Sequence, residues 1–277
     1  MEKFAFHKYS GHGNDFVIVD NWEGVVPEKD MNKIAKLMCR PKFGVGADGA
    51  VFIIPGPDDV DFAWRFFNAD GSEADMCGNA SRCTAHLAAN LGIAPDDMSF
   101  KTKAGVVEAL VNDRMVKVQM PKVGRPEGAA LVEVEGVSLT YHRVNTGVPH
   151  AVAWVEDLEN FPVFKVGRAV RRHPAFAPDG ANINFVKILG PDRLAIRTYE
   201  RGVEDETLAC GTGATAAALL GLAQGLLAAA SVTCQTRGGD DLTISVEGPL
   251  EAPDKVFLEG KVRHLFSAQV EADLFLK

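Results

Sequence analysis

At 277 residues the chain is long for one compact domain and sufficient for two. Its 47% hydrophobic and 24% charged residues are typical of an ordinary globular protein. The net charge is −8 and no basic run offers a phosphate-binding stripe, so the composition argues against nucleic acid as a partner.

Short alternating segments predict strands in the first half of the chain. Apolar residues alternate or run together at 16–20, 51–54 and 62–67, and again at 115–120. A single strongly helical stretch begins between these groups, just after Cys77-Gly78. The second half repeats this plan, with expected strands at 151–155, 183–188, 193–199 and 242–248 around a helix that begins after Cys210-Gly211.

The segment 214–232 (ATAAALLGLAQGLLAAASV) is nearly long enough to span a bilayer. It is interrupted by Gln224 and Gly225 and has no flanking cations, which favours a buried core helix. The N-terminal residues lack the apolar core of a signal peptide. We therefore expect no membrane association and a cytoplasmic location.

The sequence repeats itself at a long and nearly constant offset. Cys77-Gly78 and Cys210-Gly211 lie 133 residues apart, and four more landmarks match at offsets of 132 to 134: 46–48 with 180–182, Gly13 with Gly147, 67–68 with 199–200, and Thr102 with Thr236. Such a period is too long for a solenoid and indicates two duplicated domains.

The predicted fold class is therefore α+β. We expect two pseudo-symmetric domains, each a mainly antiparallel sheet curled around a central helix. The first domain is predicted at 1–120 and the second at 121–262, with a C-terminal strand at 263–277 returning to the first.

Each predicted central helix begins with a cysteine followed by small residues. The N–H groups of a first helical turn have no intrahelical partner, so they are available to bind a carboxylate. The positive end of a helix also favours the thiolate form of a cysteine. A single such cysteine is more often a capping or core residue, but Cys77 and Cys210 lie on matched landmarks.

Two thiols related by a pseudo-two-fold axis suit the inversion of a stereocentre. One thiolate removes a proton from one face of a carbon atom and the other thiol delivers a proton to the opposite face. Each sulfur would lie about 3–3.5 Å from the reacting carbon, and therefore roughly 7 Å from the other. This chemistry needs no cofactor, and the chain contains no GxGxxG or GxxxxGK[ST] motif and no evident pyridoxal phosphate lysine.

The other three cysteines have no such setting. Cys83 lies six residues into the first helix, and Cys39 and Cys234 have no acidic or glycine-rich neighbours. An odd number of cysteines without a CxxC pair argues against both a disulfide framework and a zinc site. We expect these three to be buried structural thiols, and we expect no metal.

Six motifs spread along the chain resemble those of diaminopimelate epimerase: GHGNDF (11–16), GVGADG (44–49), FNADGSEADMCGN (67–79), TGVPHAV (146–152), GANINFV (180–186) and YERGVEDETLACGTG (199–213). The resemblance implies two pseudo-symmetric α+β domains, with Cys77 and Cys210 as the proton donor and acceptor. It also implies interconversion of LL- and meso-diaminopimelate for lysine and peptidoglycan precursor synthesis, and the expected partners are this substrate and a second copy of the chain in a homodimer.

The resemblance also implies roles for individual residues. Backbone N–H groups of Gly78, Asn79, Gly211 and Thr212 would bind the reacting carboxylate. The distal amino acid would meet Asn14, Asn68, Asn182 and Arg201, with Glu200 receiving its ammonium group. His150 and Glu200 would support the two thiols. The asparagines also lie on the repeated landmarks, which strengthens their assignment.

Three positions depart from the pattern of this family. Val148 stands where some members carry an asparagine, Gly49 where some carry a glutamine, and Ala80 where a glycine is often present. Any polar contacts made by the asparagine and the glutamine are therefore absent here. Recognition of the distal carboxylate is the part of the assignment that these departures affect.

Three other functions remain open from the sequence. A two-cysteine racemase of proline or hydroxyproline would use the same thiols, although it would need a small apolar pocket instead of the Asn, Glu and Arg set. A non-catalytic amino-acid binder or a thiol redox protein could also use the same residues.

Overall fold

The computed structural model describes residues 3–250 and 252–271. Contacts divide the chain into two compact units, which are unit 1 (1–118 and 260–277) and unit 2 (119–259). The sequence predicts domains at 1–120 and 121–262, with a strand at 263–277 returning to the first, and these boundaries stay a prediction. Residues 272–277 of that strand lie outside the described residues.

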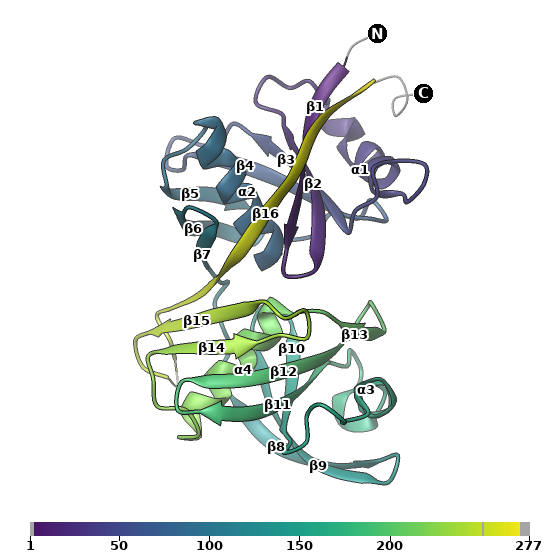
Figure 1. The fold of residues 1–277 in the computed structure, drawn as a ribbon, viewed down its shortest axis with the longest axis vertical. Helices are drawn as coiled ribbons and strands as arrows, with labels where there is room; N and C mark the ends of the chain where they lie inside the picture. Colours follow the sequence, from purple (N-terminus) through teal and green to yellow (C-terminus); the bar gives the residue numbers. More distant parts are fainter. Residues whose placement is uncertain (1–2, 251, 272–277) are drawn as a thin grey trace. The chain divides into compact units, whose positions relative to one another are not determined.

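Unit 1 is a ring of strands around one long helix. Its strands are β1 (Lys3–Gly11), β2 (Asn14–Asp20), β3 (Gly49–Ile54), β4 (Phe62–Asn68), β5 (Asp97–Thr102), β6 (Gly105–Asn112), β7 (Met115–Gln119) and the later part of β16 (Lys255–Glu271). They are hydrogen-bonded in this order, and β16 also pairs with β1, which closes the ring. Figure 1 shows β16 running alongside β1.

The helix inside this ring is α2 (Gly78–Leu91), which contacts β1, β2, β3 and β6. Every residue of α2 from Gly78 to Ala88 is buried, as expected for a helix with strands on all sides. It ends at Gly92, whose left-handed backbone (φ 70°) suits a glycine cap. On its outer side the ring carries η1 (Glu28–Asp30) and α1 (Met31–Cys39), and α1 packs on β3 and β4.

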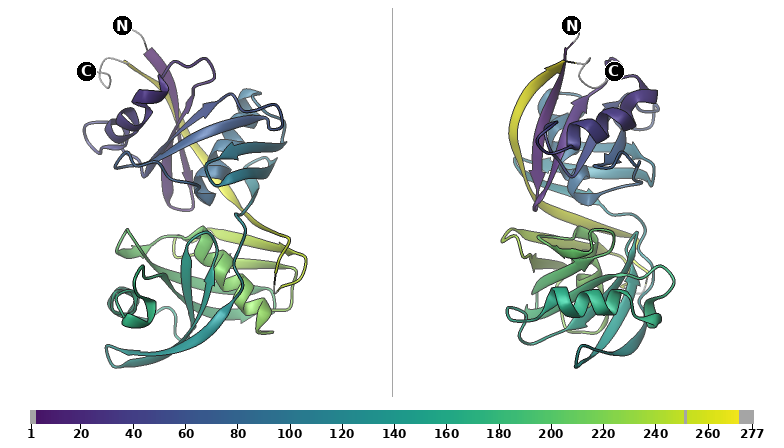
Figure 2. Two further views of the ribbon diagram at one scale, coloured as in Figure 1. Left: turned by 180° about the vertical axis from the view of Figure 1, so that it is seen from behind. Right: turned by 90° about the vertical axis from the view of Figure 1, so that its right-hand side faces the viewer.

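Unit 2 has the same plan. Its strands are β8 (Glu127–Val134), β9 (Val137–Asn145), β10 (Pro149–Trp154), β11 (Asn182–Gly190), β12 (Arg193–Glu200), β13 (Asp205–Thr207), β14 (Ser231–Gln235) and β15 (Asp241–Glu247). Its helices are α3 (Val163–Arg171), η2 (Pro174–Phe176) and α4 (Gly211–Ala223). In Figure 1 α4 lies behind β12 and β14, and it lies in front of them in the reversed view of Figure 2.

The order of strand pairings repeats from one unit to the other. In unit 1 β1–β2, β3–β4 and β5–β6 are antiparallel, whereas β2–β3 and β4–β5 are parallel. In unit 2 β9–β10, β11–β12 and β14–β15 are antiparallel, whereas β10–β11 and β12–β14 are parallel. The predicted class, two α+β units with mainly antiparallel sheets around a central helix, is confirmed.

The structure adds one helix to each unit that the sequence analysis did not predict. These are α1 and α3, and each of them is only nine residues long. Each buries one face in an apolar cluster of its own unit: Ile34, Ala35 and Met38 from α1, and Val163, Val166 and Val170 from α3. Short helices carry little periodic signal, and packing rather than propensity stabilises them.

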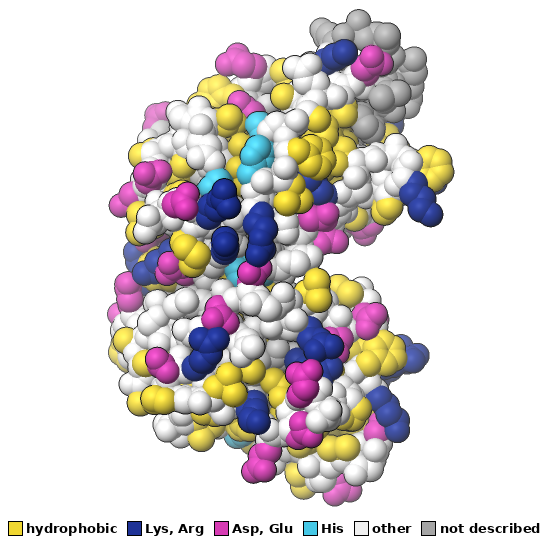
Figure 3. Space-filling view, in the orientation of Figure 1, with side chains coloured by type: hydrophobic (Ala, Val, Ile, Leu, Met, Phe, Trp, Pro, Cys, Tyr) yellow, Lys and Arg dark blue, Asp and Glu magenta, His cyan; other side chains and the backbone are white. Residues whose placement is uncertain are grey.

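The helix α4 is buried from Gly213 to Leu222, and most of its residues are small. The sequence predicts a buried core helix for 214–232; the structure confirms the helix as far as Ala223 and has the start of β14 at Ser231. None of the helices in residues 3–250 and 252–271 is both long and apolar enough to cross a membrane. Figure 3 shows a mixed polar surface, with histidine side chains on the face of unit 1 that carries β1 and β16.

Candidate active site

The two cysteines on matched landmarks occupy the same structural position in the two units. Cys77 is the N-cap residue of α2, with φ −144° and ψ 121°, and Cys210 is the N-cap residue of α4, with φ −127° and ψ 108°. Each side chain therefore lies where the first N–H groups of a buried helix point outward. Cys77 is half-buried and Cys210 is 6% exposed.

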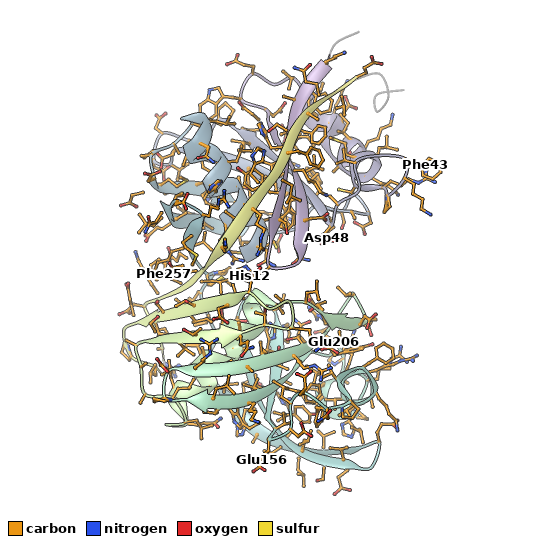
Figure 4. The ribbon with its side chains drawn as sticks, viewed as in Figure 1. His12, Phe43, Asp48, Glu156, Glu206 and Phe257 are labelled. Carbon is orange, nitrogen blue, oxygen red and sulfur yellow. The ribbon has the colours of Figure 1, made fainter. Side chains whose placement is uncertain are left out.

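In unit 1 the start of α2 is joined to the β1–β2 turn by side-chain amides. Asn79 Nδ2 donates to Asn14 Oδ1 at 2.6 Å, and Asn14 Nδ2 donates to Asp48 Oδ2 at 3.1 Å. Asp48 precedes β3, and it is labelled in Figure 4 together with His12 of the β1–β2 turn. Because a carboxylate only accepts hydrogen bonds, this chain fixes which end of each amide is the oxygen.

The same chain of amides begins at a buried cation. Arg82, on α2, is fully buried, and its Nη2 donates to Asn79 Oδ1 at 2.6 Å. The same Nη2 lies 3.2 Å from His12 Nδ1. Desolvation lowers the pKa of Arg82 to about 10, so it stays cationic at neutral pH. Its Nε and Nη1 atoms have no hydrogen-bond partner in the described part of the chain. The guanidinium of Arg82 thus places a positive charge beside the start of α2.

Asn68 lies at the end of β4, where its Nδ2 donates to Ser72 Oγ at 3.1 Å. It pairs with Gly49 across the β3–β4 ladder, and the next residue, Ala69, donates its N–H to Asp48 O at 3.0 Å. The structure therefore places Asn68 beside the Asp48 end of the amide chain. Its own side chain is bonded within the 68–72 turn.

In unit 2 the residues predicted from the sequence gather at the ends of three neighbouring strands. His150 lies on β10 and is 1% exposed, Asn182 starts β11, and Glu200 ends β12. The parallel register sets His150 opposite Asn182. Asn182 Oδ1 accepts the backbone N–H of Arg201 at 2.8 Å, and Arg201 Nη1 lies 3.4 Å from Asp179 O.

The start of α4 is fixed by two further contacts. Thr146 Oγ1 donates to the carbonyl oxygen of Thr212 at 3.0 Å, and Cys210 Sγ lies 3.4 Å from Thr212 Oγ1. Gly213 leaves no room for a side chain, because a Cβ there would lie 2.4 Å from Asn184 Oδ1 and 3.3 Å from Cys210 Sγ. Glycine at this position therefore lets Cys210 and Asn184 pack closely.

Sequence reasoning did not identify Arg82, Asp48 or Asn184. Asn184 is fully buried on β11, two residues after Asn182, and its Nδ2 lies 3.1 Å from His150 Nδ1. Asn184 and Arg82 could have been recognised in the sequence as polar residues within an otherwise apolar strand and helix. Asp48 could have been recognised as a carboxylate in a repeated landmark, matched to Asn182.

The three departures from the family pattern have different structural settings. At Gly49 a Cβ would lie 2.7 Å from a ring carbon of Phe66 and 2.9 Å from the carbonyl oxygen of Phe67, so no side chain fits. Val148 lies in the β9–β10 turn, where its carbonyl oxygen accepts the N–H of Thr146 at 3.2 Å. Ala80 is fully buried on α2.

Burial governs the ionisation of His150. Desolvation, followed by the charge of Arg201, lowers the pKa of His150 to about 3, whereas an unfolded chain has a histidine pKa of about 6.5. The stability contribution of this neutral histidine is therefore complete above pH 6.5 and is lost as the pH falls toward 3.

We expect the free energy of unfolding to fall by about 1.4 kcal/mol per pH unit in this range through His150 alone. Denaturant unfolding of the wild type and of His150→Gln, measured from pH 7 to pH 4, tests this. The variant should show a flatter dependence, and parallel curves would contradict the assigned burial and protonation state.

The other thiols are set apart from Cys77 and Cys210. Burial raises the pKa of Cys39 and of Cys83 to about 12, and it raises the pKa of Cys234 as well. We expect iodoacetamide at pH 8 to modify Cys77 first and Cys210 next, because thiolate character and access set the rate. Peptide mass spectrometry gives the order, and modification of Cys83 ahead of Cys77 would refute it.

Comparison with solved structures gives the class of the fold. A hydroxyproline epimerase from Agrobacterium vitis matches with a TM-score of 0.73 at 17% identity, covering 98% of this chain and 93% of that one. A PhzF-family phenazine biosynthesis protein from Bacillus anthracis matches with a TM-score of 0.72 at 15% identity, over 98% of this chain and 100% of that one. The chain thus has the fold of the epimerase and PhzF class.

The family itself is set by sequence similarity. The family model for diaminopimelate epimerase matches residues 6–125 and 142–265. A diaminopimelate epimerase from Aquifex aeolicus is 44% identical over 97% of this chain and 98% of its own length. The chain belongs to the diaminopimelate epimerase family, which is a family of isomerases.

Proposed function

We propose that this protein interconverts LL- and meso-diaminopimelate by moving one α-proton with two thiols, Cys77 and Cys210. The observation that carries the proposal is the equivalent position of the two cysteines, each at the N-cap of the buried helix of its unit. Membership of the diaminopimelate epimerase family supports the choice of substrate.

The proposed proton transfer balances without any additional group. One cysteine thiolate takes the α-proton from one face of the carbon, which leaves a carbanion whose charge spreads onto the carboxylate. The other cysteine, as a thiol, delivers a proton to the opposite face and becomes the thiolate. The configuration is inverted and the enzyme is left ready for the reverse reaction. The N–H groups at the two helix starts stabilise the charge that develops on the carboxylate.

Binding roles follow from the chemistry of the residues around the two helix starts. The backbone N–H groups of the first helical turns would hold the reacting carboxylate. The distal amino acid would be held by side-chain amides, a guanidinium and a carboxylate. For the reacting carboxylate we propose the backbone N–H groups of Gly78, Asn79, Gly211 and Thr212. For the distal amino acid we propose the side chains of Asn14, Asn68, Asn182, Glu200 and Arg201. We assign the support of the thiols to His150 and Glu200.

The reaction is proposed to need no cofactor, since two thiols supply both the base and the acid. Activity should then survive dialysis against a metal chelator and treatment with a carbonyl reagent that traps pyridoxal phosphate. Activity lost on dialysis and restored by an added cofactor would contradict this part of the proposal.

The setting of the enzyme is also part of the proposal. Five free cysteines fit a reducing compartment, which supports the cytoplasm. Leu265 and Phe266 are half exposed on β16, which supports a homodimer through apolar contact. The product would serve lysine and peptidoglycan precursor synthesis, with no nucleic-acid or membrane partner. Light scattering of the purified chain tests the dimer.

Incubation in deuterated water tests the proposed activity directly. Each diastereomer of diaminopimelate should gain deuterium at an α-carbon and give the same final mixture of diastereomers. Trans-4-hydroxy-L-proline and proline should gain none. Deuterium in proline and none in diaminopimelate would assign the protein to the proline-type racemases instead, and no exchange in any amino acid would favour a binding or redox role.

A further inference from the structure

Both ring nitrogens of His150 lie beside side-chain amides. His150 Nδ1 is 3.1 Å from Asn184 Nδ2, and His150 Nε2 is 3.4 Å from Asn182 Nδ2. All three residues are at least 96% buried, so water does not compete for these positions. The tautomer of the neutral ring is therefore decided by which atoms of the two amides face it.

The orientation of the Asn184 amide is set by its backbone neighbours. Its Nδ2 lies 3.0 Å from the carbonyl oxygen of Ala151 and 3.3 Å from that of Asn182, and carbonyl oxygens only accept hydrogen bonds. Its Oδ1 accepts from Thr198 Oγ1 at 2.9 Å. Turning the amide over would set its oxygen against two carbonyl oxygens, so the nitrogen of the amide, which cannot accept a hydrogen bond, faces His150 Nδ1.

The Asn182 amide is fixed in the same way. Its Oδ1 accepts the backbone N–H of Arg201 at 2.8 Å, so its Nδ2 is the atom that faces His150 Nε2. A doubly protonated ring would then meet an N–H donor at each nitrogen. The shorter contact is with Asn184, and 3.4 Å lies outside the usual hydrogen-bond range. The lone pair of the ring is therefore on Nδ1 and its proton is on Nε2.

We propose that Asn184, held by Thr198 and the Ala151 carbonyl, is a positioning residue that holds the neutral His150 ring with its proton on Nε2, so that this ring offers one N–H donor to the reaction. The inference rests on the proposed function. Asn184 is fully buried and acts only through its neighbours. Gly213 packs against Asn184 Oδ1 and Cys210 Sγ, which joins this network to the start of α4.

The charged groups near His150 are consistent with a neutral ring. Arg201, at the end of β12, lowers the pKa of His150. Arg143 of β9, Glu127 of β8 and Asp179 of the loop before β11 line the cavity of about 190 Å³ to which His150 also contributes. An amide oxygen beside Nδ1 would raise the pKa of His150, but the Ala151 carbonyl excludes that orientation.

The test combines nitrogen NMR of histidine-labelled enzyme with kinetics. In the wild type, the signals that are lost in His150→Gln should show Nε2 protonated and Nδ1 unprotonated from pH 6 to pH 9. Asn184→Asp places a carboxylate beside Nδ1, which should protonate that nitrogen and move the titration of the ring upward into this range. Nδ1 protonated in the wild type would overturn the proposal.

Kinetics separate this positioning role from a merely structural one. Asn184→Asp should lower kcat at least about tenfold with little change in KM for diaminopimelate, because a wrong tautomer removes acid–base assistance. It should also add an ionisation to the pH profile of kcat. Asn112→Asp adds the same charge at an exposed position and should leave both unchanged. An unchanged kcat and pH profile in Asn184→Asp would contradict the proposal.

A second variant guards against a failure of Asn184→Asp to fold. Thr198→Val keeps the shape of the side chain and removes the O–H that holds Asn184 Oδ1. The carbonyl oxygens of Ala151 and Asn182 still face Asn184 Nδ2, so this variant should keep the Nε2–H tautomer of His150. A protonated Nδ1 in this variant would show that the carbonyls do not fix the amide, and it would contradict the proposal. The proposed function is tested separately, because it fails if the wild type does not turn over diaminopimelate. The NMR result on the His150 tautomer does not depend on that turnover.

Discussion

Replacing Cys77 or Cys210 with alanine is expected to lower epimerase turnover by about 10²- to 10⁴-fold, since each change removes one of the two thiols of the proposed proton transfer. Both cysteines are N-cap residues, and neither substitution removes a backbone group from its helix. Turnover of LL-diaminopimelate, followed by deuterium incorporation and by chiral chromatography, measures the loss.

Two other cysteines give matched controls. Cys39 and Cys234 are fully buried, and their alanine variants should keep turnover within about threefold while losing about 1–2 kcal/mol of stability. Circular dichroism should show the same fold in all four variants. Near wild-type turnover in either Cys77→Ala or Cys210→Ala would refute the two-thiol mechanism.

Arg201→Ala should reduce kcat/KM for diaminopimelate by about 100-fold, because the distal carboxylate would lose the charged hydrogen-bond donor proposed for it. The bond from the backbone N–H of Arg201 to Asn182 does not depend on the side chain, so the substitution tests the guanidinium alone. Val148 offers no amide that could share the carboxylate, which makes the dependence on Arg201 heavier.

Arg193→Ala is the matched control for this substitution. Arg193 starts the same strand, β12, and is paired with Asp241 at 2.9 Å on an exposed surface. Its loss should change kcat/KM by less than about twofold. Lysine and proline should be poor substrates of the wild type and equally poor for Arg201→Ala. If Arg193→Ala and Arg201→Ala behave alike, Arg201 does not bind the substrate.

The class of the fold could be predicted because the chain carries its plan twice. The 133-residue offset between Cys77 and Cys210 indicated two equivalent helix starts, and the structure has α2 and α4 at those positions. By contrast, α1 and α3 went unpredicted, since nine residues with one buried face give a weak pattern. Their existence depends on packing against strands that are distant in the sequence.

The sequence predicted those residues of the candidate site that could be recognised from their own residue type and their place in a repeated motif. The two cysteines, His150 and Asn182 lie on repeated motifs, and the β10–β11 register sets the last two opposite each other. The role proposed for Asn184 depends on the carbonyl of Ala151 and the hydroxyl of Thr198, which come from neighbouring strands. Strand pairing of this kind cannot be deduced from the composition of one segment.

The tight packing around Gly49 limits how the sequence of this protein can change. A side chain at that position would meet both the Phe66 ring and the carbonyl oxygen of Phe67, and the second of these belongs to the backbone of β4. Trimming Phe66 alone would therefore not make room for a glutamine at this position. Any variant with a side chain at position 49 would first need a change in the spacing of β3 and β4, which pair at Gly49 and Asn68.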